Sequence, residues 1–362
     1  MRGAAWAWGV AVALGPLAWA LTRLVEPAWV EANFVQGIGQ PVAAAIGVVT
    51  GAADWPVGEA AIVGLSGLVL VVVVGGLVRS GRGARLRWAW PRALAIASGG
   101  YAVFVAIWGL NYRREPLWVA FGYPEVKPTR DEVRALSAEL VAATNVARGK
   151  VPEGEGGVAR LAGDFGDAAV RAQDVYARAA VRWPFLGGRY ARAKPLFASE
   201  TISYGGLGGI YLPFTAEPNV NVDQLAFDWP FDILHEMAHQ RGVAREDEAN
   251  FVAFVVARDY GDPDFVYGAT LAMAGYAVSA LEEVDPDTAG GLWANLGLGT
   301  RRDLLARKRR SEKYETPLRD VGREVNHTYL RSNGVDDGVQ SYGRVVDLLV
   351  AERRVRRAVP KE

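Results

Sequence analysis

Three long apolar stretches in the first 110 residues constrain the fold more than any other feature of this 362-residue chain. They are residues 4–21, 60–78 and 93–110. Each is close to the roughly 20 residues that a helix needs to cross the hydrocarbon core of a bilayer. We therefore predict a transmembrane region over residues 1–110, with three spans, followed by a separate domain over residues 111–362. A signal peptide is the alternative for the first stretch, but no convincing cleavage site follows it.

The charges around these stretches predict how the chain is oriented in the membrane. Residues 25–78 contain no Lys or Arg, whereas residues 79–92 contain five arginines. Positively charged connections stay on the cytoplasmic side of a membrane, so we expect this link inside and the domain outside. Residues 34–50 are also mildly apolar, but their polar residues and glycines favour an interfacial or re-entrant segment over a fourth span.

The composition excludes several classes of function. The chain has no cysteine, which rules out disulfides, thiolate metal ligands and cysteine nucleophiles. Its 40 basic and 40 acidic residues balance to a net charge of zero. A nucleic-acid-binding protein carries a basic footprint, so we expect no nucleic acid partner. The lipid bilayer is the first partner that the sequence predicts, and the sequence leaves the oligomeric state undetermined.

Residues 111–362 read as mainly helical, with a small sheet, which places the fold in the mainly α (α+β) class. Thr129 and Glu132 form a capping box that opens an amphipathic helix. Residues 265–281 are apolar enough for a membrane span, but their small residues and acidic flanks favour a buried core helix. Residues 300–323 and 339–357 resemble further helices.

The stretch ISYGGLGGIYLPFTAEPNVN, residues 202–221, differs from its surroundings. Its β-forming residues are interrupted by glycines, which leave the backbone accessible. Proline cannot donate to a β ladder, and we expect Pro213 and Pro218 to exclude a central strand position. We therefore predict an edge strand followed by a loop.

The sequence HEMAH, residues 235–239, holds two of the three histidines of the chain. Asp228, Pro230 and Gly242 mark the start and end of a helix around it. At 3.6 residues per turn, His235 and His239 lie on one face, so both imidazoles can converge on one cation. Glu236 points about 100° away. It lies beside the cation, where a general base must stand to take a proton from a water molecule.

A catalytic zinc usually takes three protein ligands and leaves a fourth position open. The segment EDEAN, residues 246–250, supplies a third ligand at the start of the next helix. We predict that Glu246 binds the metal and that Asn250, on the same face, hydrogen-bonds a ligand imidazole and fixes its tautomer. Glu248 is the alternative ligand if that helix starts in a different register. Two imidazoles and a carboxylate suit Zn²⁺ best among the common divalent metals.

At these residues the chain resembles the gluzincin metallopeptidases, in which HExxH is followed by a glutamate that opens an ExxA(D/N) segment. That resemblance implies a zincin-like domain with a substrate-binding edge strand above the motif helix. Residues 202–214 are the natural candidate for this strand, through Gly208, Gly209, Ile210 and Tyr211. It also implies a His or Tyr that stabilises the oxyanion of the reaction. The candidates for this role are His327, Tyr329 and Tyr342, and the sequence does not choose among them.

More closely, the chain is similar to a bacterial membrane-anchored family known as domain of unknown function 3810. The stretches that carry the similarity are residues 108–117, 208–221, 231–254 and 325–349. With the N-terminal spans, it covers nearly the whole chain. It implies a multi-pass protein of the bacterial cytoplasmic membrane, whose domain lies outside the cytoplasm, and it brings no substrate.

The sequence thus predicts a membrane-anchored zinc metallopeptidase of the cell envelope, acting on a peptide or protein. His235, His239 and Glu246 would hold the zinc, and Glu236 would activate the water that attacks the peptide carbonyl. A non-catalytic protein with a structural or sensing zinc is one alternative, and a fourth protein ligand would favour it. An amidase acting on cell-wall peptides is another. A polar helix whose histidines only satisfy local hydrogen bonds is the simplest.

Overall fold

The computed structural model of the chain describes residues 2–79, 82–333, 335 and 344–358. The described chain is mainly helical with one three-stranded sheet, which confirms the predicted fold class. The helices are α1 Arg2–Leu24, α2 Pro27–Trp29, η1 Val30–Gly39, α3 Gln40–Thr50, α4 Val57–Arg79, α5 Arg82–Ile107, η2 Gly109–Arg113, α6 Leu117–Phe121, α7 Arg130–Arg148, η3 Glu155–Gly157, α8 Phe165–Arg182, η4 Pro184–Leu186, α9 Ser199–Ser203, α10 Trp229–Gln240, α11 Glu246–Tyr260, α12 Pro263–Glu282, α13 Pro286–Ala294, α14 Leu298–Glu312, α15 Pro317–Ser332 and α16 Val345–Ala358. The strands are β1 Lys194–Pro195, β2 Gly209–Leu212 and β3 Glu217–Val220.

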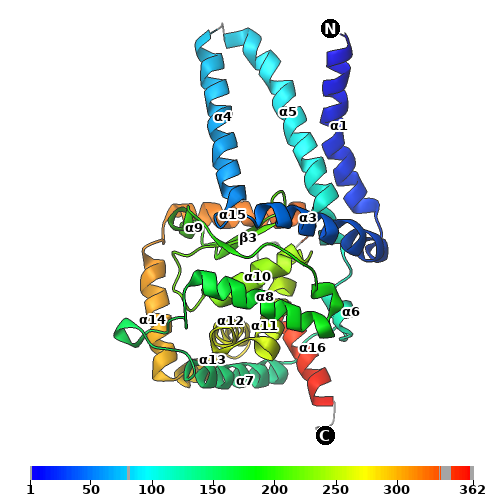
Figure 1. Ribbon diagram of the computed structural model, residues 1–362. Coiled ribbons are helices and arrows are strands. Elements are labelled where there is room, and N and C mark those ends of the chain that lie inside the picture. The colour runs from blue at the N-terminus through cyan, green and yellow to red at the C-terminus, as the bar shows by residue number, and fades with distance from the viewer. Residues whose placement is uncertain (1, 80–81, 334, 336–343, 359–362) are drawn as a thin grey trace.

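Three long helices, α1, α4 and α5, project from one face of a globular domain (Figure 1). They coincide with the three predicted apolar stretches. We expected residues 79–92 to be a link between two helices. Instead, α5 begins at Arg82, so most of these residues are helical. Large apolar side chains point outward on all three helices, as shown by Leu17 (65% exposed), Val63 (66%) and Ile96 (72%).

A fourth apolar segment lies crosswise to these helices. By length and composition alone, Pro27–Thr50 can span a membrane, and among the described residues it is the one helical stretch that can. Gly9–Leu24, Val57–Val69 and Arg92–Ile107 are shorter apolar stretches. Pro27–Thr50 comprises α2, η1 and α3. In Figure 1, α3 runs along the top of the domain, across the direction of α1 and α5.

Helices α1 and α5 pack together through small residues. Pro16 has no N–H, so within α1 it cannot donate to the carbonyl of Val12. The hydroxyl of Ser98 in α5 donates to that carbonyl instead, at 2.7 Å. Gly15 lets the helices approach, because a Cβ there would lie 2.7 Å from Ser98 Oγ. The carbonyl that the proline leaves without a donor is thus satisfied by a side chain of the neighbouring helix.

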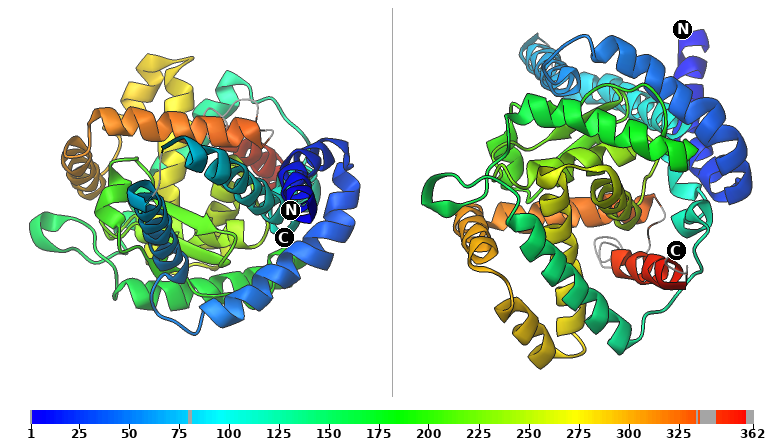
Figure 2. Two further views of the ribbon diagram at one scale, coloured as in Figure 1. Left: turned by 90° about the horizontal axis from the view of Figure 1, so that it is seen from above. Right: turned by 60° about the horizontal axis from the view of Figure 1, so that its bottom comes forward.

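The domain core surrounds α10. This helix contacts β2 and β3 on one side and α8, α11 and α12 on others. Its apolar side chains Ile233, Leu234 and Met237 are fully buried. The right-hand view of Figure 2 shows α7 and α16 on the far side of this group from the projecting helices. The predicted buried helix over residues 265–281 is confirmed as α12, which packs against α7 and α10 within the domain.

The sheet has the order β1-β3-β2, so β2 is an edge strand and β3 is central. The edge strand was predicted correctly, but the exclusion of Pro218 from a central strand was wrong. Pro218 pairs with Tyr211 of β2, whereas β1 is so short that it pairs only with Asn219 and Val220. Proline is therefore tolerated in β3 because no β1 residue stands beside it to need its missing N–H.

The projecting helices are bound to the domain by polar contacts. The carboxylate of Glu217 in β3 accepts from the backbone N–H groups of Val57 (3.1 Å) and Gly58 (2.6 Å), where α4 begins. A carboxylate at a helix N-terminus is stabilised by the exposed amides and the helix dipole. The N–H groups of Phe197 and Ala198 donate to Glu59, in the first turn of α4. The base of α4 is thus joined to the sheet and the segment after β1.

The segment Pro27–Thr50, which runs along the domain, is also bound to it by polar contacts. Arg114, 6% exposed, makes a two-pronged ion pair with Glu31, with distances of 2.7 and 2.8 Å. Gln40 donates from Nε2 to the carbonyls of Phe185 and Arg241, both at 2.9 Å. The second of these carbonyls lies at the C-terminal end of α10. The segment therefore contacts the helix that carries the histidines.

The helix predicted over residues 300–323 is two helices. It breaks between Glu312 and Pro317, because proline has no N–H to continue the hydrogen-bonding of α14 and is favoured in the first turn of a new helix. Figure 1 shows α14 along one side of the domain and α15 across the face from which α1, α4 and α5 project.

Candidate metal centre

The histidine helix α10 begins and ends where the sequence predicts. Pro230 lies in its first turn, and Gly242 follows it with a φ of 79°, a conformation that favours glycine. Arg241, 2% exposed, donates to the carbonyls of Leu186 (2.7 Å) and Met237 (2.9 Å). Its guanidinium lies 3.8 Å from the ring centroid of Tyr176. A buried cation thus satisfies carbonyls at the end of the helix and fixes its position.

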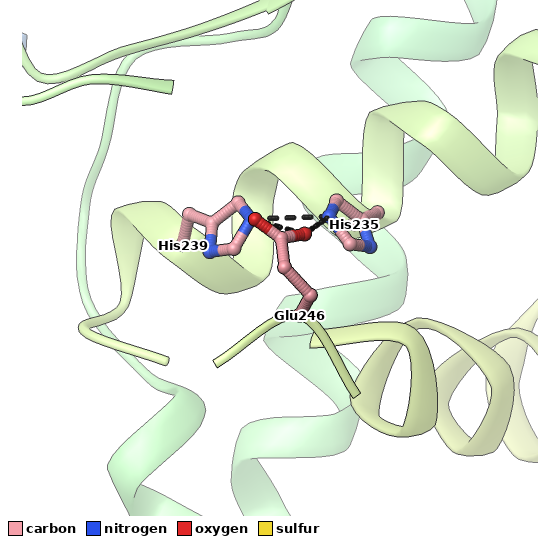
Figure 3. A group of neighbouring side chains, drawn as sticks. All are labelled: His235, His239 and Glu246. Carbon is pink, nitrogen blue, oxygen red and sulfur yellow. Dashed lines mark hydrogen bonds and ion pairs between the residues drawn. The ribbon is translucent and has the colours of Figure 1, made fainter. Parts of the chain in front are cut away.

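The structure brings together the three predicted metal ligands, His235, His239 and Glu246. Figure 3 shows the two imidazoles on one side of α10, facing the carboxylate that enters from the start of α11. One ligand atom from each residue lies within 4.8 Å of the others. Glu246 Oε2 lies 3.0 Å from His235 Nε2 and 3.5 Å from His239 Nε2. This compact set fits the donor atoms that zinc prefers.

The hydrogen bonds behind the two imidazoles fix their tautomers. His239 Nδ1 lies 2.7 Å from the carbonyl oxygen of Val243, which can only accept a hydrogen bond. His235 Nδ1 lies 2.9 Å from Oδ1 of Asn250, whose Nδ2 donates to the hydroxyl of Tyr276 at 3.3 Å. Each Nδ1 therefore carries the hydrogen, and each Nε2 presents a lone pair. Asn250 takes the predicted role, while Tyr276 in α12 was missed because no motif marks it.

The Nε2 atoms of His235 and His239 lie 3.0 Å apart, with Glu246 beside both. Neutral imidazoles with hydrogen on Nδ1 offer only acceptors here. Acceptors at this distance repel one another unless a proton or a metal cation lies among them. Burial alone would lower the pKa of His239, but the charge and hydrogen bond of Glu246 outweigh it and raise the pKa to about 9. The cluster therefore attracts positive charge.

The pKa values of the other two ligands respond to the same contacts. Burial lowers the pKa of His235, although the hydrogen bond to Glu246 opposes the shift. Burial favours the neutral form of Glu246, but the two imidazoles outweigh it and lower the pKa of the carboxyl. Glu246 therefore remains an anion, which is the form that binds a cation.

Glu236 lies next to the cluster and is 5% exposed. Among the described residues, its Oε2 is buried without a hydrogen-bond partner. Burial raises the pKa of Glu236 to about 8, while the charge of His239 opposes the shift. A carboxylate whose pKa is moved toward neutrality can both take up and release a proton near pH 7. This is the requirement for a general base.

The two glutamates at the start of α11 have different surroundings. The carboxylate of Glu248 accepts from the backbone N–H of Leu117 at 2.8 Å and from Arg245 at 3.3 Å. It is therefore occupied in holding α6, whereas Glu246 joins the two histidines. The geometry favours Glu246 over its predicted alternative as the ligand.

The predicted substrate strand lies against α10. A Cβ on Gly208 would meet the carboxylate of Asp232 at 3.0 Å, and one on Gly209 would meet Glu236 Oε1 at 2.6 Å. Glycine is therefore required for β2 to approach the motif helix so closely. Ile210 is 37% exposed, while Tyr211 is buried against Trp108, with ring centroids 5.7 Å apart.

Aromatic residues form one wall beside the ligands. The indole of Trp108, the residue after α5, lies 6.3 Å from the His239 ring and donates to the His239 carbonyl at 3.4 Å. The hydroxyl of Tyr112 donates to that of Tyr329 at 3.3 Å. Beyond the family-like stretch at residues 108–117, no motif in the sequence marks Trp108 or Tyr112.

The oxyanion candidates fall in different places. Tyr329 is 41% exposed as a whole residue. Burial of its hydroxyl raises the pKa to about 12; the hydrogen bond from Tyr112 opposes this shift, and the charge of Glu246 adds to it. Two residues along a helix turn the direction by about 200°, so His327 and Tyr329 point to nearly opposite sides of α15. Tyr342 lies outside the described residues. The geometry favours Tyr329.

One family comparison bears on this chain. A model of the family described as "Protein of unknown function (DUF3810)" matches residues 34–350, which is most of the chain. No curated protein and no solved structure matches. The matched range includes the ligand set on α10 and α11, the strand β2 and helix α15. The chain therefore belongs to the DUF3810 family.

Proposed function

We propose that this protein is a membrane-anchored zinc metallopeptidase with a zincin-like domain, which hydrolyses peptide bonds outside the cytoplasm. One observation carries the proposal. Two imidazole nitrogens and a carboxylate oxygen converge within 4.8 Å of one another, and the Nδ1 of each imidazole is held by an acceptor behind it. Such a set of acceptors needs a proton or a metal cation among them, and its donor atoms fit zinc.

The number of ligands favours catalysis over a structural role. Within residues 2–79, 82–333, 335 and 344–358, the ligand cluster has three members. Structural zinc sites are closed by four protein ligands, whereas catalytic sites use three and keep a position for water and substrate. When bound, zinc supplies Lewis acidity, which makes water a better nucleophile and polarises the substrate carbonyl.

Glu236 is the general base of the proposed reaction. Its buried, unpartnered Oε2 accepts a proton from the attacking water as the bond to the peptide carbonyl carbon forms. The same carboxyl then donates this proton to the departing amine as the C–N bond breaks. A pKa near neutrality suits both transfers. Tyr329 is the proposed donor to the oxyanion, because its hydroxyl lies near Glu246 and Tyr112 and is kept protonated.

The strand β2 supports a polypeptide substrate over another amide. It is an edge strand, and the backbone of its residues Gly209 and Tyr211 lies beside Glu236. An extended peptide can add to such an edge through main-chain hydrogen bonds. Pairing there would hold the scissile bond near the general base. This favours a peptidase over an amidase that acts on a compact cell-wall substrate.

In this proposal, α1, α4 and α5 are the three membrane-spanning helices. Their exposed apolar side chains and common direction away from the domain support it. Arg79 ends α4, and Arg82, Arg85 and Arg87 lie in the first two turns of α5, at the ends of the two helices that Figure 1 shows far from the domain. By the positive-inside rule these ends are cytoplasmic, which leaves the domain outside the cytoplasm.

The test compares the wild-type protein with Glu236→Gln in detergent micelles. Zinc content is measured by elemental analysis, and hydrolysis is measured on a mixed peptide library by mass spectrometry. We expect one zinc per chain in both proteins, and hydrolysis in the wild type that a chelator abolishes. Glu236→Gln should lower the rate at least 100-fold. Equal activity of the two proteins, or no zinc in the wild type, would overturn the proposal.

A further inference from the structure

Helix α15 exposes an apolar stripe. Leu318, Val321 and Val325, at spacings of three and four residues, are 60%, 58% and 64% exposed, and Tyr329 continues the same side. This spacing places them on one face of the helix. An adjoining side packs on the domain, where Leu330 is fully buried. An amphipathic helix that keeps its apolar face in water is unfavourable, so this face requires a partner.

The position of α15 indicates the partner. Seen from the side of the projecting helices, α15 (orange) runs across the face of the domain beside α5 (left view of Figure 2). Gly322 lies so close to the backbone of Gly205 that a Cβ there would be 2.8 Å from it. Helix α15 is thus joined to the loop that precedes β2.

Other exposed apolar side chains lie on segments that contact the base of α4. Phe197 is 70% exposed, and its N–H donates to Glu59. Phe214 is 55% exposed and lies between Leu212 and Thr215, whose side chains contact Gly58. These residues therefore lie where α4 leaves the domain. Phe197 and Phe214 thus form a second apolar area, in addition to the α15 stripe, on the face from which α4 projects.

The metal ligands are close to this face. Helix α5 ends at Ile107, and the next residue, Trp108, donates to the carbonyl of His239. Tyr329, at the end of the α15 stripe, contacts Tyr112 five residues after Ile107. The metal ligand His239 and the proposed oxyanion donor Tyr329 are thus each in contact with a residue that closely follows α5, a proposed span.

Resting on the proposed function, we infer that α15 lies on the lipid surface and that the substrate is a polypeptide anchored in the same membrane, cleaved close to its anchor. A helix with an apolar face and arginines beside it suits the interface of a bilayer with anionic headgroups. Arg319, Arg323 and Arg331 supply these cations, and Asp320 and Glu324 offset part of the charge. Contact with lipid would keep soluble peptides from the site and leave membrane-anchored chains beside it.

The lipid contact is tested without using activity. Because the chain has no cysteine, single variants can carry one environment-sensitive fluorophore each. We compare Val321→Cys and Val325→Cys with the matched controls Asp320→Cys and Glu324→Cys, which lie on the same helix and are also exposed. The full chain is placed in nanodiscs of anionic and zwitterionic lipid, with a lipid-soluble quencher. We expect the first pair to be quenched at least threefold more than the second. Equal quenching of all four would overturn the inference.

The substrate class is tested with a reporter that has one transmembrane helix and a 60-residue unstructured tail, reconstituted with the full zinc-loaded chain. The same tail without its anchor is the soluble control. Extended chain covers about 3.3 Å per residue. We expect cleavage within roughly ten residues of the anchor, which corresponds to about 33 Å, and at least tenfold slower cleavage of the soluble tail.

The outcomes separate the two proposals. Cuts spread evenly along the anchored tail, or equal rates for the soluble tail, would overturn the membrane-bound substrate and leave the peptidase intact. No cleavage of either tail above the level of Glu236→Gln, with zinc bound, would overturn the peptidase itself. In that case the quenching of the fluorophores still shows whether α15 lies on the lipid surface.

Discussion

The backbone of Gly209 lies so close to the carboxylate of Glu236 that a methyl group on Gly209 would be 2.6 Å from Oε1. The edge strand and Glu236, the proposed general base, therefore fix each other's position. A substrate that pairs with β2 is held beside the group that would transfer the proton.

The substitution Gly209→Ala tests this contact. We expect kcat/KM to fall about 100-fold, because a shift of about 1 Å in a catalytic group has an effect of this size. Zinc content should change little, whereas the melting temperature should fall somewhat, because the same Cβ would lie 2.7 Å from the backbone carbonyl oxygen of Asn219 in β3. Gly290→Ala is the matched control, since a Cβ at Gly290 meets nothing within 4 Å. Unchanged activity in Gly209→Ala would show that the approach of β2 does not position Glu236.

The two glutamates at the start of α11 provide a test of the ligand set. Glu246→Gln should weaken zinc binding at least 100-fold, because it removes the anion that holds the cluster. Glu248→Gln should leave zinc affinity within threefold of the wild type, since its carboxylate contacts Leu117 and Arg245 instead. Competition with a chromophoric chelator measures both. The reverse order of affinities would assign the metal to Glu248.

Asn250 fixes the tautomer of His235, so its removal should weaken zinc binding although Asn250 is not itself a ligand. We expect Asn250→Ala to bind zinc 10- to 100-fold more weakly, the range seen when a group behind a ligand is lost. Asn250→Asp keeps an acceptor for Nδ1 and should bind as tightly as the wild type. If both variants bind alike, the hydrogen bond to Asn250 has no part in metal binding.

Lys194 and Glu217 form a buried ion pair of 2.5 Å, with exposures of 4% and 0%. Breaking a buried pair costs about 3–5 kcal/mol, because the remaining charge loses its counterion. The ammonium of Lys194 would keep only the carbonyls of Thr50 (2.7 Å) and Trp55 (3.0 Å). Glu217→Gln should therefore lower the melting temperature in detergent clearly. The double variant Glu217→Gln with Lys194→Met removes both charges and should recover much of the loss. A double variant less stable than the single one would argue against this explanation.

The stability of the metal-free protein should depend on Asp232. Burial raises the pKa of Asp232 to about 7, and the charge of Asp228 adds to the shift, against the hydrogen bond from Gln224. The folded state then binds a proton that the unfolded state has already lost, so Asp232 makes the free energy of unfolding fall as pH rises from about 4 to about 7. Asp232→Asn should raise the melting temperature at pH 8 more than at pH 5. Equal effects at both values would refute a raised pKa.

The sequence was sufficient to predict features that depend on local spacing. His235, Glu236 and His239 lie within one helix, so helical geometry alone predicts their relation, and the cap at Thr129 follows from four consecutive residues. Glu246 was predictable because only a short turn separates it from α10. The long helices α1, α4 and α5 follow from their apolar length.

Features that depend on distant partners were not predictable. Tyr276 reaches Asn250 only because α12 packs against α11. Pro218 is tolerated in a central strand only because β1 is short, which the sequence of β3 does not reveal. The break before Pro317 turns α15 onto the face of the projecting helices, and helical periodicity on either side of the proline concealed it.

The contacts that bind the helices to the domain lie in separate places: Arg114 with Glu31, Gln40 with the end of α10, and Glu217 with the start of α4. A domain on one flexible stalk can pivot and search a large volume. A domain fastened at several points around its edge cannot, so with the proposed membrane anchorage its height and tilt over the bilayer would be constant. With the proposed peptidase activity, selection of targets would depend first on which chains reach that height, and only afterwards on the side chains around the cleaved bond.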